Sequence, residues 1–484
     1  MEMILLRILD FYCLVVKHLD KKINVIINGK TLLVDKGSLL SDILNINKPC
    51  GGHGICGKCS IIVNGKKELA CKYIINSEIE VDYFKTKDII SNSGVNEDGE
   101  LSENLCLVLD IGTTTIALAL VSLDSKKVIK VITKTNPQTI YGADVMTRIE
   151  YCQKNSIYKL QSVLIEKLNE MINEFDIDFI DTMYVSANVT MLYTFFGIDC
   201  SSIGVAPYKA QFLEQKVIKA NNIGINKVGT IISLPSVASF VGADIVSGMN
   251  YIGMPSNNDY YLLIDLGTNA EIVLFSNKNG VCTSAAAGPC FEGANICCGT
   301  SAIDGAIYNC EIKDGINHYK TINDCEEIGI CGTGLIDIIS ELLKIGFIDE
   351  TGYMEKNFCF SDNVYLSPKD VRQYQLAKSA VYSSIISLMK SINISFDNIN
   401  KVFVSGGFSA MINVSNAIKT GLFPVEFENK IIAINNSSLL GTIKYAIDGG
   451  NLERFITNLN YIDISTKEYF NDLYIENMIF DYKN

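Results

Sequence analysis

An internal repeat constrains the fold of this chain more than any other feature of the sequence. Residues 105–123 read LCLVLDIGTTTIALALVSL, and residues 260–275 read YYLLIDLGTNAEIVLF. Each copy is an apolar run that ends in an aspartate, a turn of small polar residues and a second apolar run, which predicts two strands joined by a tight turn. Two such copies in a chain of 484 residues predict a duplicated fold.

The segments after each copy continue the duplication. A strand at 128–135, helices at 142–154 and 157–175 and a strand at 181–188 follow the first copy, and helices at 333–345 and 368–391 and a strand at 401–410 follow the second. Strand hairpins followed by helices and strands predict two α/β halves with a cleft between them. We place the first half at 105–255, the second at 256–450 and a C-terminal tail from there to residue 484.

The repeated turn has the chemistry of a phosphate site. Backbone N–H groups and hydroxyls in such a turn can bind a phosphate, and the aspartate before it can hold a hydrated Mg²⁺ or an attacking water. The residues are Asp110, Gly112, Thr113, Thr114 and Thr115 in the first copy and Asp265, Gly267, Thr268 and Asn269 in the second. One such turn alone is typical of an ordinary hairpin, so the prediction depends on having both.

The two turns resemble the phosphate-1 and phosphate-2 motifs of the ASKHA superfamily, which contains acetate and sugar kinases, heat-shock chaperones and actin and has duplicated ribonuclease H-like halves. The resemblance implies three further parts of an ATP site. They are the adenosine motif Ser405-Gly406-Gly407-Phe408, the segment Gly242-Ala243-Asp244 that opens a helical connector, and Gly332-Thr333-Gly334 before a helix whose N-terminus can face an anion. An ordinary loop bend is the alternative for Gly406-Gly407, and P-loop and Rossmann fingerprints are absent.

Four cysteines near the N-terminus form a second motif. Cys50, Cys56 and Cys59 have C-x5-C-x2-C spacing, and Cys71 follows after a short gap. Three thiolates on a glycine-rich loop and a fourth after it suit a [2Fe-2S] cluster, because glycine lets the backbone approach the sulfurs closely. The spacing resembles that of plant-type and adrenodoxin-like ferredoxins. The alternatives are a structural zinc site and a chance cysteine-rich loop, although zinc knuckles usually pair two C-x2-C clips and only one is present.

The segments around the cysteines predict a small β-rich domain. Asn28-Gly29 and Asn64-Gly65 each join two apolar runs and are strong hairpin signals, with a short helix at 38–44 and a strand at 79–84. This order fits a β-grasp ferredoxin domain at residues 20–85. Residues 1–19 are then an N-terminal extension, and the polar stretch 86–104 is a linker that tethers the electron-transfer domain.

The charge balance disfavours two classes of partner. A formal net charge of −13 and a pI near 4.9 argue against nucleic acid and anionic membranes. No segment reaches spanning length without a charge, so we expect a cytoplasmic protein. Only three histidines occur, which excludes a His-rich catalytic metal site. Cys290, Cys297 and Cys298 cluster in sequence, and buried core thiols are favoured there over a second metal centre.

A [2Fe-2S] domain ahead of an ASKHA ATPase domain resembles one family, the reductive activators of corrinoid-dependent proteins (RACE family). Besides the cysteine loop and DIGTTT, the resemblance includes NPQTIYGADVMTRI (136–149), GPCFEG (288–293), GICGTGLIDIISELLKIGFID (329–349) and QLAKSAV (375–381). It implies ATP-dependent reduction of Co(II) to Co(I) in a corrinoid protein or corrinoid methyltransferase, with an upstream low-potential electron donor. Related ATPase domains commonly pair, so we also expect a homodimer.

The resemblance implies that Asp110 and Asp265 position Mg²⁺ and the attacking water, with Asp244 as an auxiliary residue. Three other functions stay open. A small-molecule kinase with a redox domain needs a general base, for which Asp144, Asp244 and Glu292 are candidates. An ATP-switched scaffold would use the cluster only to stabilise a fold. An activator of another low-potential acceptor, such as a dehydratase, is disfavoured by the separate ferredoxin domain.

Overall fold

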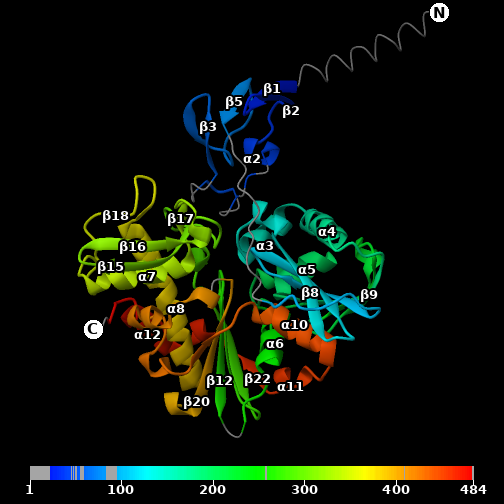
Figure 1. Cartoon of the computed structure of the whole chain (residues 1–484), viewed down its shortest axis with the longest axis vertical. Coiled ribbons are helices and arrows are strands. Elements are labelled where there is room, and N and C mark those ends of the chain that lie inside the picture. Colours follow the sequence, from blue (N-terminus) through cyan, green and yellow to red (C-terminus); the bar gives the residue numbers. More distant parts are fainter. Residues whose placement is uncertain are drawn as a thin grey trace, which may run out of the picture. The chain divides into compact units, whose positions relative to one another are not determined.

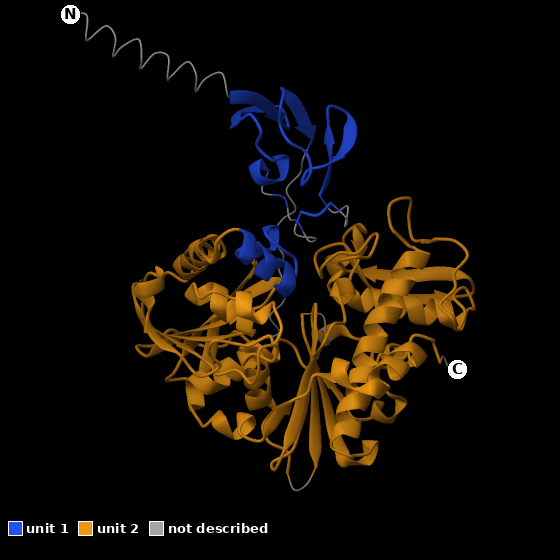
Figure 2. Ribbon diagram, turned by 180° about the vertical axis from the view of Figure 1, so that it is seen from behind, with its two compact units in different colours: residues 1–88, 137–154 blue, residues 89–136, 155–484 orange. Residues whose placement is uncertain are grey.

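The structure, a computed structural model, describes residues 22–44, 46, 48, 52–54, 59–82, 95–256, 259–407 and 409–481. Contacts divide the chain into two units, which Figure 2 shows in different colours. Unit 1 comprises residues 1–88 and 137–154, and unit 2 comprises residues 89–136 and 155–484. Elements are labelled in Figure 1.

Unit 1 contains a five-stranded sheet of order β2-β1-β5-β3-β4. Both predicted hairpins are confirmed, because β1 pairs antiparallel with β2, β3 pairs antiparallel with β4, and the residues of both Asn-Gly turns have positive φ. The elements are β1 (Lys22–Ile27), β2 (Lys30–Asp35), α2 (Leu40–Ile43), β3 (Ser60–Val63), β4 (Lys66–Leu69), β5 (Ile79–Asp82) and α3 (Val145–Lys154). Helix α2 is shorter than the predicted 38–44 and has no side-chain cap at Leu39.

The first half of unit 2 is built on a six-stranded sheet of order β10-β11-β9-β6-β7-β8. Its strands are β6 (Leu105–Ile111), β7 (Thr115–Ser122), β8 (Lys127–Thr135), β9 (Ile180–Ala187), β10 (Val217–Lys219) and β11 (Val228–Ser233). Its helices are α4 (Ile157–Asn173), α5 (Val189–Phe196) and α6 (Ala243–Ile252).

The second half has a six-stranded sheet of order β21-β20-β12-β13-β14-β22, with smaller sheets inserted after β14. Its strands are β12 (Tyr260–Leu266), β13 (Ala270–Phe275), β14 (Gly280–Ala285), β15 (Ala306–Lys313), β16 (Ile316–Thr321), β17 (Gly329–Ile330), β18 (Phe358–Cys359), β19 (Tyr365–Leu366), β20 (Ile399–Ser405), β21 (Ile431–Ala433) and β22 (Leu459–Tyr461). Its helices are α7 (Gly332–Lys344), α8 (Pro368–Ser391), α9 (Val414–Lys419), α10 (Ser437–Asp448), α11 (Glu453–Ile456) and α12 (Glu468–Glu476).

Five strands of the two large sheets share one order, which confirms the predicted duplication. In each, a three-stranded antiparallel meander is extended by two parallel strands, giving β8-β7-β6-β9-β11 in the first half and β14-β13-β12-β20-β21 in the second. The first strand of each meander is central; β6 is buried except at Leu105, and β12 is buried at Leu262, Leu263, Ile264 and Leu266. The near-continuous run of apolar residues in these strands follows from burial on both faces of the sheet.

Helices α6 and α10 join the two halves through close backbone contact. A Cβ placed on Gly441 of α10 would lie 1.8 Å from the carbonyl oxygen of Ser247 on α6, so only glycine fits there. The Asn250 side chain donates to the Gly441 carbonyl oxygen at 3.0 Å, and Ser247 donates to the Ser438 carbonyl oxygen at 2.6 Å. Leu439 of α10 is buried together with residues of β6 and β7, so a helix from late in the chain covers the first sheet.

Part of the predicted linker lies along β8. Gly99 donates its backbone N–H to the Val128 carbonyl oxygen at 2.9 Å, and the Glu97 carboxylate accepts the backbone N–H of Val131 at 2.9 Å. These bonds satisfy backbone polar groups of β8, an edge strand whose outer N–H and C=O groups would otherwise face solvent. Residues 95–104 therefore belong to the first half, while the remainder of the predicted linker, 86–94, lies outside the described residues.

The C-terminal tail is anchored on α8. Phe480 is 1 % exposed and stacks on Tyr374, while Lys378 donates to the Ile479 carbonyl oxygen at 2.6 Å and lies 4.9 Å from the centre of the Phe480 ring. Burial lowers the pKa of Lys378 to about 8, although the negative charge of Asp481 acts to raise it. The tail is therefore a packed part of the second half.

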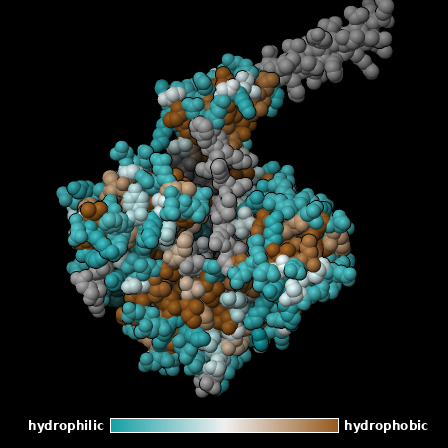
Figure 3. Space-filling view, viewed as in Figure 1, coloured by the Kyte–Doolittle hydropathy of each residue, from teal (hydrophilic) through white to brown (hydrophobic). Residues whose placement is uncertain are grey.

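Hydrophilic residues dominate the face of unit 2 seen in Figure 3, and an apolar area lies on the part of that face formed by the second half. Within the described ranges, no helix is long and apolar enough to cross a membrane.

Candidate functional site

The turn between β6 and β7 is fixed by hydrogen bonds to its backbone. Gly112 donates its N–H to the Thr115 carbonyl oxygen at 2.9 Å. Asn136, which is fully buried, donates its backbone N–H to the Thr114 carbonyl oxygen and its side-chain amide to the Gly112 carbonyl oxygen, both at 2.8 Å. Asn136 therefore holds the first turn from the end of β8.

The hydroxyl side chains of this turn are also positioned by a helix end. Asn188 caps the N-terminus of α5 by accepting the backbone N–H of Met191 at 2.9 Å, and its amide donates to Thr113 Oγ1 at 3.1 Å. The second turn, between β12 and β13, is closed by a bond from the Gly267 N–H to the Asn269 carbonyl oxygen at 2.9 Å.

Asp110 lies one residue before the end of β6, opposite Ser186 in the parallel pairing with β9. Its two carboxylate oxygens accept hydrogen bonds from the Asn436 amide at 2.6 Å and the Ser438 hydroxyl at 2.7 Å, both at the start of α10. Burial raises the pKa of Asp110, although these hydrogen bonds oppose the shift. Asp110 is thus both a candidate site residue and the anchor of α10 on the first sheet.

Three further carboxyl groups lie near one another in the same unit. Burial and the charge of Asp265 raise the pKa of Asp244 to about 7, and burial with the charges of Asp110 and Glu292 raises the pKa of Asp265 to about 7. Glu271, opposite Asp265 in the β12–β13 pairing, has its pKa raised well above its ordinary value by burial and by both aspartates. The site concentrates negative charge, so a cation would stabilise it.

The arrangement of carboxylates fits a magnesium ion bound together with phosphates. Among the residues that the structure describes, no group of three or more His, Cys, Asp or Glu side chains could hold a metal ion. Mg²⁺ beside phosphates keeps several waters and needs only one or two carboxylates. Asp244 and Asp265 are therefore the candidates to hold Mg²⁺. Their raised pKa values favour the protonated carboxyl groups, and the positive charge of a bound Mg²⁺ would favour the ionised carboxylates instead.

One carboxylate connects the two turns. Thr114 of the first turn and Thr268 of the second turn both donate their hydroxyl hydrogen to Oε2 of Glu292, at 3.1 Å and 2.6 Å. The structure therefore brings the two copies of the repeated motif to one place. The sequence showed the repeat but did not show that the turns converge there.

The other predicted glycines have packing reasons of their own. Gly406 has φ 124°, and a Cβ on it would lie 2.1 Å from the Leu266 carbonyl oxygen, so β20 passes close to the end of β12. Cβ atoms on Gly332 and Gly334 would lie 2.1 Å from the Phe291 and 2.0 Å from the Ile307 carbonyl oxygens. Thr333 between them is buried, and Gly407 is exposed. Contact of these residues with a nucleotide stays a prediction, and Phe408 lies outside the described residues.

Two of the four predicted cluster ligands fall in the described part of unit 1. Cys59 precedes β3 and Cys71 follows β4, so the hairpin register places them at the same open end, and the Ala70 N–H donates to the Cys59 carbonyl oxygen at 3.0 Å. They are 1 % and 4 % exposed. Two buried thiols at one end of a hairpin suit an iron–sulfur centre. Cys50 and Cys56 lie outside the described residues.

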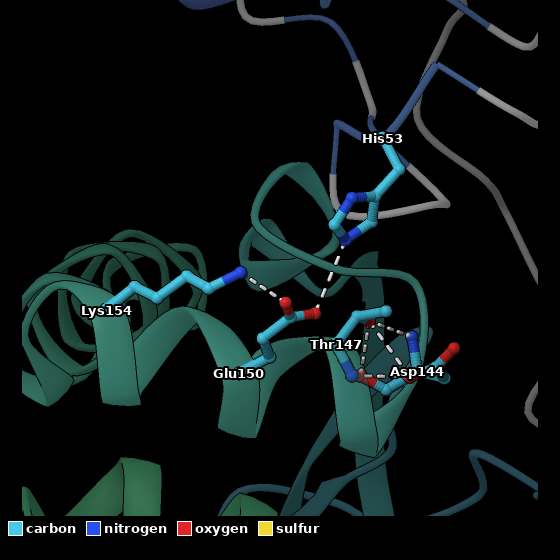
Figure 4. A network of polar contacts seen from close by, with 5 residues as sticks. All are labelled: His53, Asp144, Thr147, Glu150 and Lys154. Carbon is cyan, nitrogen blue, oxygen red and sulfur yellow. Dashed lines mark hydrogen bonds and ion pairs between the residues drawn. The ribbon is translucent and has the colours of Figure 1, made fainter.

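His53, which lies between Cys50 and Cys56 in the sequence, contacts α3. His53 Nε2 lies 3.4 Å from Glu150 Oε2, and Glu150 is also paired with Lys154 one turn further along the helix (Figure 4). These contacts lower the pKa of Glu150, with the Lys154 hydrogen bond as the larger cause. Asp144 accepts the backbone N–H of Thr147 at 2.7 Å and so caps the same helix (Figure 4). This capping accounts for Asp144 without a role as a general base.

The second group of cysteines is divided between core and surface. Cys290 is buried, whereas Cys297 is exposed and lies 3.2 Å from the Ser367 hydroxyl. Cys298 lies 3.4 Å from the Asn363 carbonyl oxygen. The expectation of a core thiol is confirmed for Cys290 and is wrong for Cys297.

Sequence reasoning missed several residues of this site. Asn436 and Ser438 carried no signal, because they lie more than 320 residues from Asp110 along the chain. Asn136 belongs to the NPQTIYG segment, which we used only for the family resemblance. An asparagine directly after a strand, at the level of a glycine turn, is the signal that would have found it.

Comparison with known proteins shows to which family the chain belongs. A family model described as the C-terminal domain of RACo, the ASKHA domain, matches residues 259–484, and a model described as the RACo middle region matches residues 105–257. A solved structure entitled "Reductive activator for corrinoid,iron-sulfur protein" shares the fold, with a TM-score of 0.72, 24 % identity and coverage of 96 % of this chain and 99 % of that one. The chain belongs to the family of reductive activators of corrinoid-dependent proteins.

Two curated relatives agree with membership in the RACE family. The corrinoid activation enzyme RamQ of Eubacterium limosum is 27 % identical over 417 residues, which cover 77 % of this chain and 70 % of the relative. The [Co(II) methylated amine-specific corrinoid protein] reductase of Methanosarcina barkeri is 25 % identical over 413 residues, which cover 76 % of each chain. The resemblance stated from the sequence motifs is therefore confirmed, and the ASKHA-type α/β fold with it.

Proposed function

We propose that this protein is an ATP-dependent reductive activator that returns an oxidised corrinoid protein or corrinoid methyltransferase from Co(II) to Co(I). The observation that carries the ATP part is the meeting of Thr114 and Thr268 on one carboxylate oxygen. Each turn alone is a common hairpin, but two hydroxyl-bearing turns aimed at one point are suited to the phosphate chain of one nucleotide. The names of the relatives support the corrinoid part.

The residues of unit 2 would bind and orient MgATP. Backbone N–H groups and hydroxyls of 112–115 and 267–269 would donate to phosphate oxygens, while Asp265 and Asp244 would hold the hydrated Mg²⁺. Asn136 and Asn188 would keep the first turn in place, and Gly406, Gly407 and Phe408 would contact the adenosine. Bound Mg²⁺ supplies positive charge that offsets the charge of the phosphates.

The cysteines of unit 1 would hold the electron carrier. Cys50, Cys56, Cys59 and Cys71 are the proposed ligands of a [2Fe-2S] cluster in a β-grasp ferredoxin domain, and such a cluster supplies one electron at a time. A low-potential donor is needed upstream. For one electron, about 59 mV corresponds to about 1.4 kcal/mol, so a few kcal/mol from ATP binding would offset a barrier of about 100–200 mV.

The proposal is tested by anaerobic absorption spectroscopy of a Co(II) corrinoid protein mixed with this protein, a reductant and MgATP. We expect a Co(I) spectrum with the wild type and ATP, and none without ATP. Cys59→Ser should remove the cluster spectrum and the Co(I) signal while leaving ATP hydrolysis intact, whereas Asp265→Asn should keep the cluster spectrum and lose both ATP hydrolysis and the Co(I) signal. Cys325→Ser, which changes an exposed cysteine far along the chain, is the matched control and should behave as the wild type.

Two results would refute the proposal. Co(I) formation by Cys59→Ser equal to that of the wild type would mean that the cysteines carry no electron and that the protein is a scaffold. A stable phosphorylated product from an acid or sugar, without Co(I), would identify a kinase.

A further inference from the structure

The Glu292 carboxylate occupies the hydroxyls that the proposed nucleotide site needs. Both Thr114 Oγ1 and Thr268 Oγ1 donate to the same oxygen, Oε2 of Glu292. A threonine hydroxyl has one hydrogen to donate. While each hydroxyl donates to Glu292, it cannot also donate to a phosphate.

The backbone that carries Glu292 is held firmly. Glu292 ends the short 3-10 helix Pro289–Glu292, and the preceding Phe291 is 1 % exposed. The Phe291 carbonyl oxygen lies against Gly332 at the start of α7, where a Cβ would come within 2.1 Å of it. Gly293, at φ 77°, packs equally closely on Thr300. Movement of the carboxylate therefore requires rotation of the Glu292 side chain, and the backbone can stay in place.

Charge repulsion, like the competition for the two hydroxyl hydrogens, opposes the presence of both the Glu292 carboxylate and a phosphate between the turns. The negative charge of Glu292 helps to raise the pKa of Asp265. A phosphate chain between the two turns would bring further negative charge next to this carboxylate. Repulsion at such short range costs free energy in a partly buried place.

We propose that Glu292 is a clasp that binds the two turns to each other in the absence of nucleotide and is displaced by the phosphate chain of ATP. The inference deepens the proposed function and rests on it. The clasp joins a turn of the first half to a turn of the second half through one side chain, and it re-forms when the phosphates leave. Glu292 therefore tunes ATP affinity through the rotation of its side chain alone.

The test is a double-mutant cycle on MgATP binding, measured by titration calorimetry with the full chain. Glu292→Ala should bind MgATP about tenfold or more tightly than the wild type, because two charged hydrogen bonds no longer have to be broken. Thr268→Val in the wild type should weaken MgATP binding less than it does in the Glu292→Ala background, since in the wild type its hydroxyl is engaged both with and without ATP. In the Glu292→Ala background, Thr268→Val should weaken binding by about fivefold or more, because the hydroxyl then serves ATP alone.

Two controls keep the outcome clear. Glu311→Ala removes an exposed negative charge from the same half and should leave the affinity unchanged. Glu292→Gln keeps the shape of the side chain and should give an intermediate gain, so it replaces Glu292→Ala if that variant does not fold. Melting of the ATP-free protein should occur at lower temperature in Glu292→Ala than in the wild type, because the two turns lose their connection.

The outcomes separate the clasp from the proposed function. Unchanged or weaker MgATP binding by both Glu292 variants, with normal binding by the wild type, overturns the clasp alone. Absence of MgATP binding by the wild type overturns the nucleotide site and the clasp together.

Discussion

Replacing Asp265 by asparagine should stabilise the protein while removing its response to MgATP. Burial and the charges of Asp110 and Glu292 raise the pKa of Asp265 from 3.8 to about 7. One pKa unit corresponds to about 1.4 kcal/mol, so the ionised form costs at most about 4 kcal/mol in the folded state. Because Asp265 is partly exposed and shares the shift with neighbouring carboxylates, we expect a gain of about 1–2 kcal/mol at pH 8.

The sign of the pH dependence identifies the cause. The folded state holds its proton up to about pH 7, whereas the unfolded chain loses it near pH 4, so wild-type stability falls as the pH rises from about 4 to about 7. The Asp265→Asn variant has no ionisable group at this position, so its stability does not fall with pH for this reason. The advantage of the variant should therefore be larger at pH 8 than at pH 5.

The assay is thermal unfolding of the wild type and Asp265→Asn at both pH values, with and without MgATP. Without nucleotide at pH 8, the variant should melt about 1–4 °C higher. With MgATP, only the wild type should gain stability. A variant that melts below the wild type at both pH values would refute the reasoning, because it would mean that the Ser405 hydrogen bond to Asp265 outweighs the repulsion. Asp448→Asn, which changes an exposed aspartate of α10, is the matched control and should melt at the same temperature as the wild type with and without MgATP.

Three further predictions concern the buried carboxyl groups, the C-terminal tail and the first turn. Mg²⁺ with ATP should raise the melting temperature more at pH 8 than at pH 6, because the pKa values of Asp244 and Asp265 are about 7 and the cation competes with their protons; an equal shift at both pH values would contradict this. Phe480→Ala should destabilise the second half by about 3–5 kcal/mol in denaturant unfolding, since it leaves a cavity against Tyr374, and a loss below about 1 kcal/mol would show that the tail is dispensable. Asn136→Ala should weaken MgATP binding by about tenfold, because the Gly112 carbonyl oxygen of the first turn loses its side-chain donor; unchanged affinity in calorimetry would remove Asn136 from the site.

Much of the fold was predictable because local patterns and tertiary structure agree. The apolar runs before Asp110 and Asp265 became central strands, and the predicted helices at 157–175, 333–345 and 368–391 correspond closely to α4, α7 and α8. The Asn-Gly hairpins formed because asparagine and glycine accept the positive φ that such turns need. Weak periodicity misled us at 86–104, where Glu97 and Gly99 bind the edge of β8 through backbone groups that leave no pattern in the sequence.

The sequence by itself determined that this chain has two copies of an Asp-Gly-Thr turn, a four-cysteine motif near its N-terminus and the motifs of the RACE family. Only the tertiary structure decided how the copies act together. The packing of α10 on the first sheet brings Asn436 and Ser438 to Asp110, and Glu292 brings Thr114 and Thr268 to one oxygen. Such contacts depend on side chains hundreds of residues apart, and their energies arise only after both halves have folded, so no local sequence pattern encodes them.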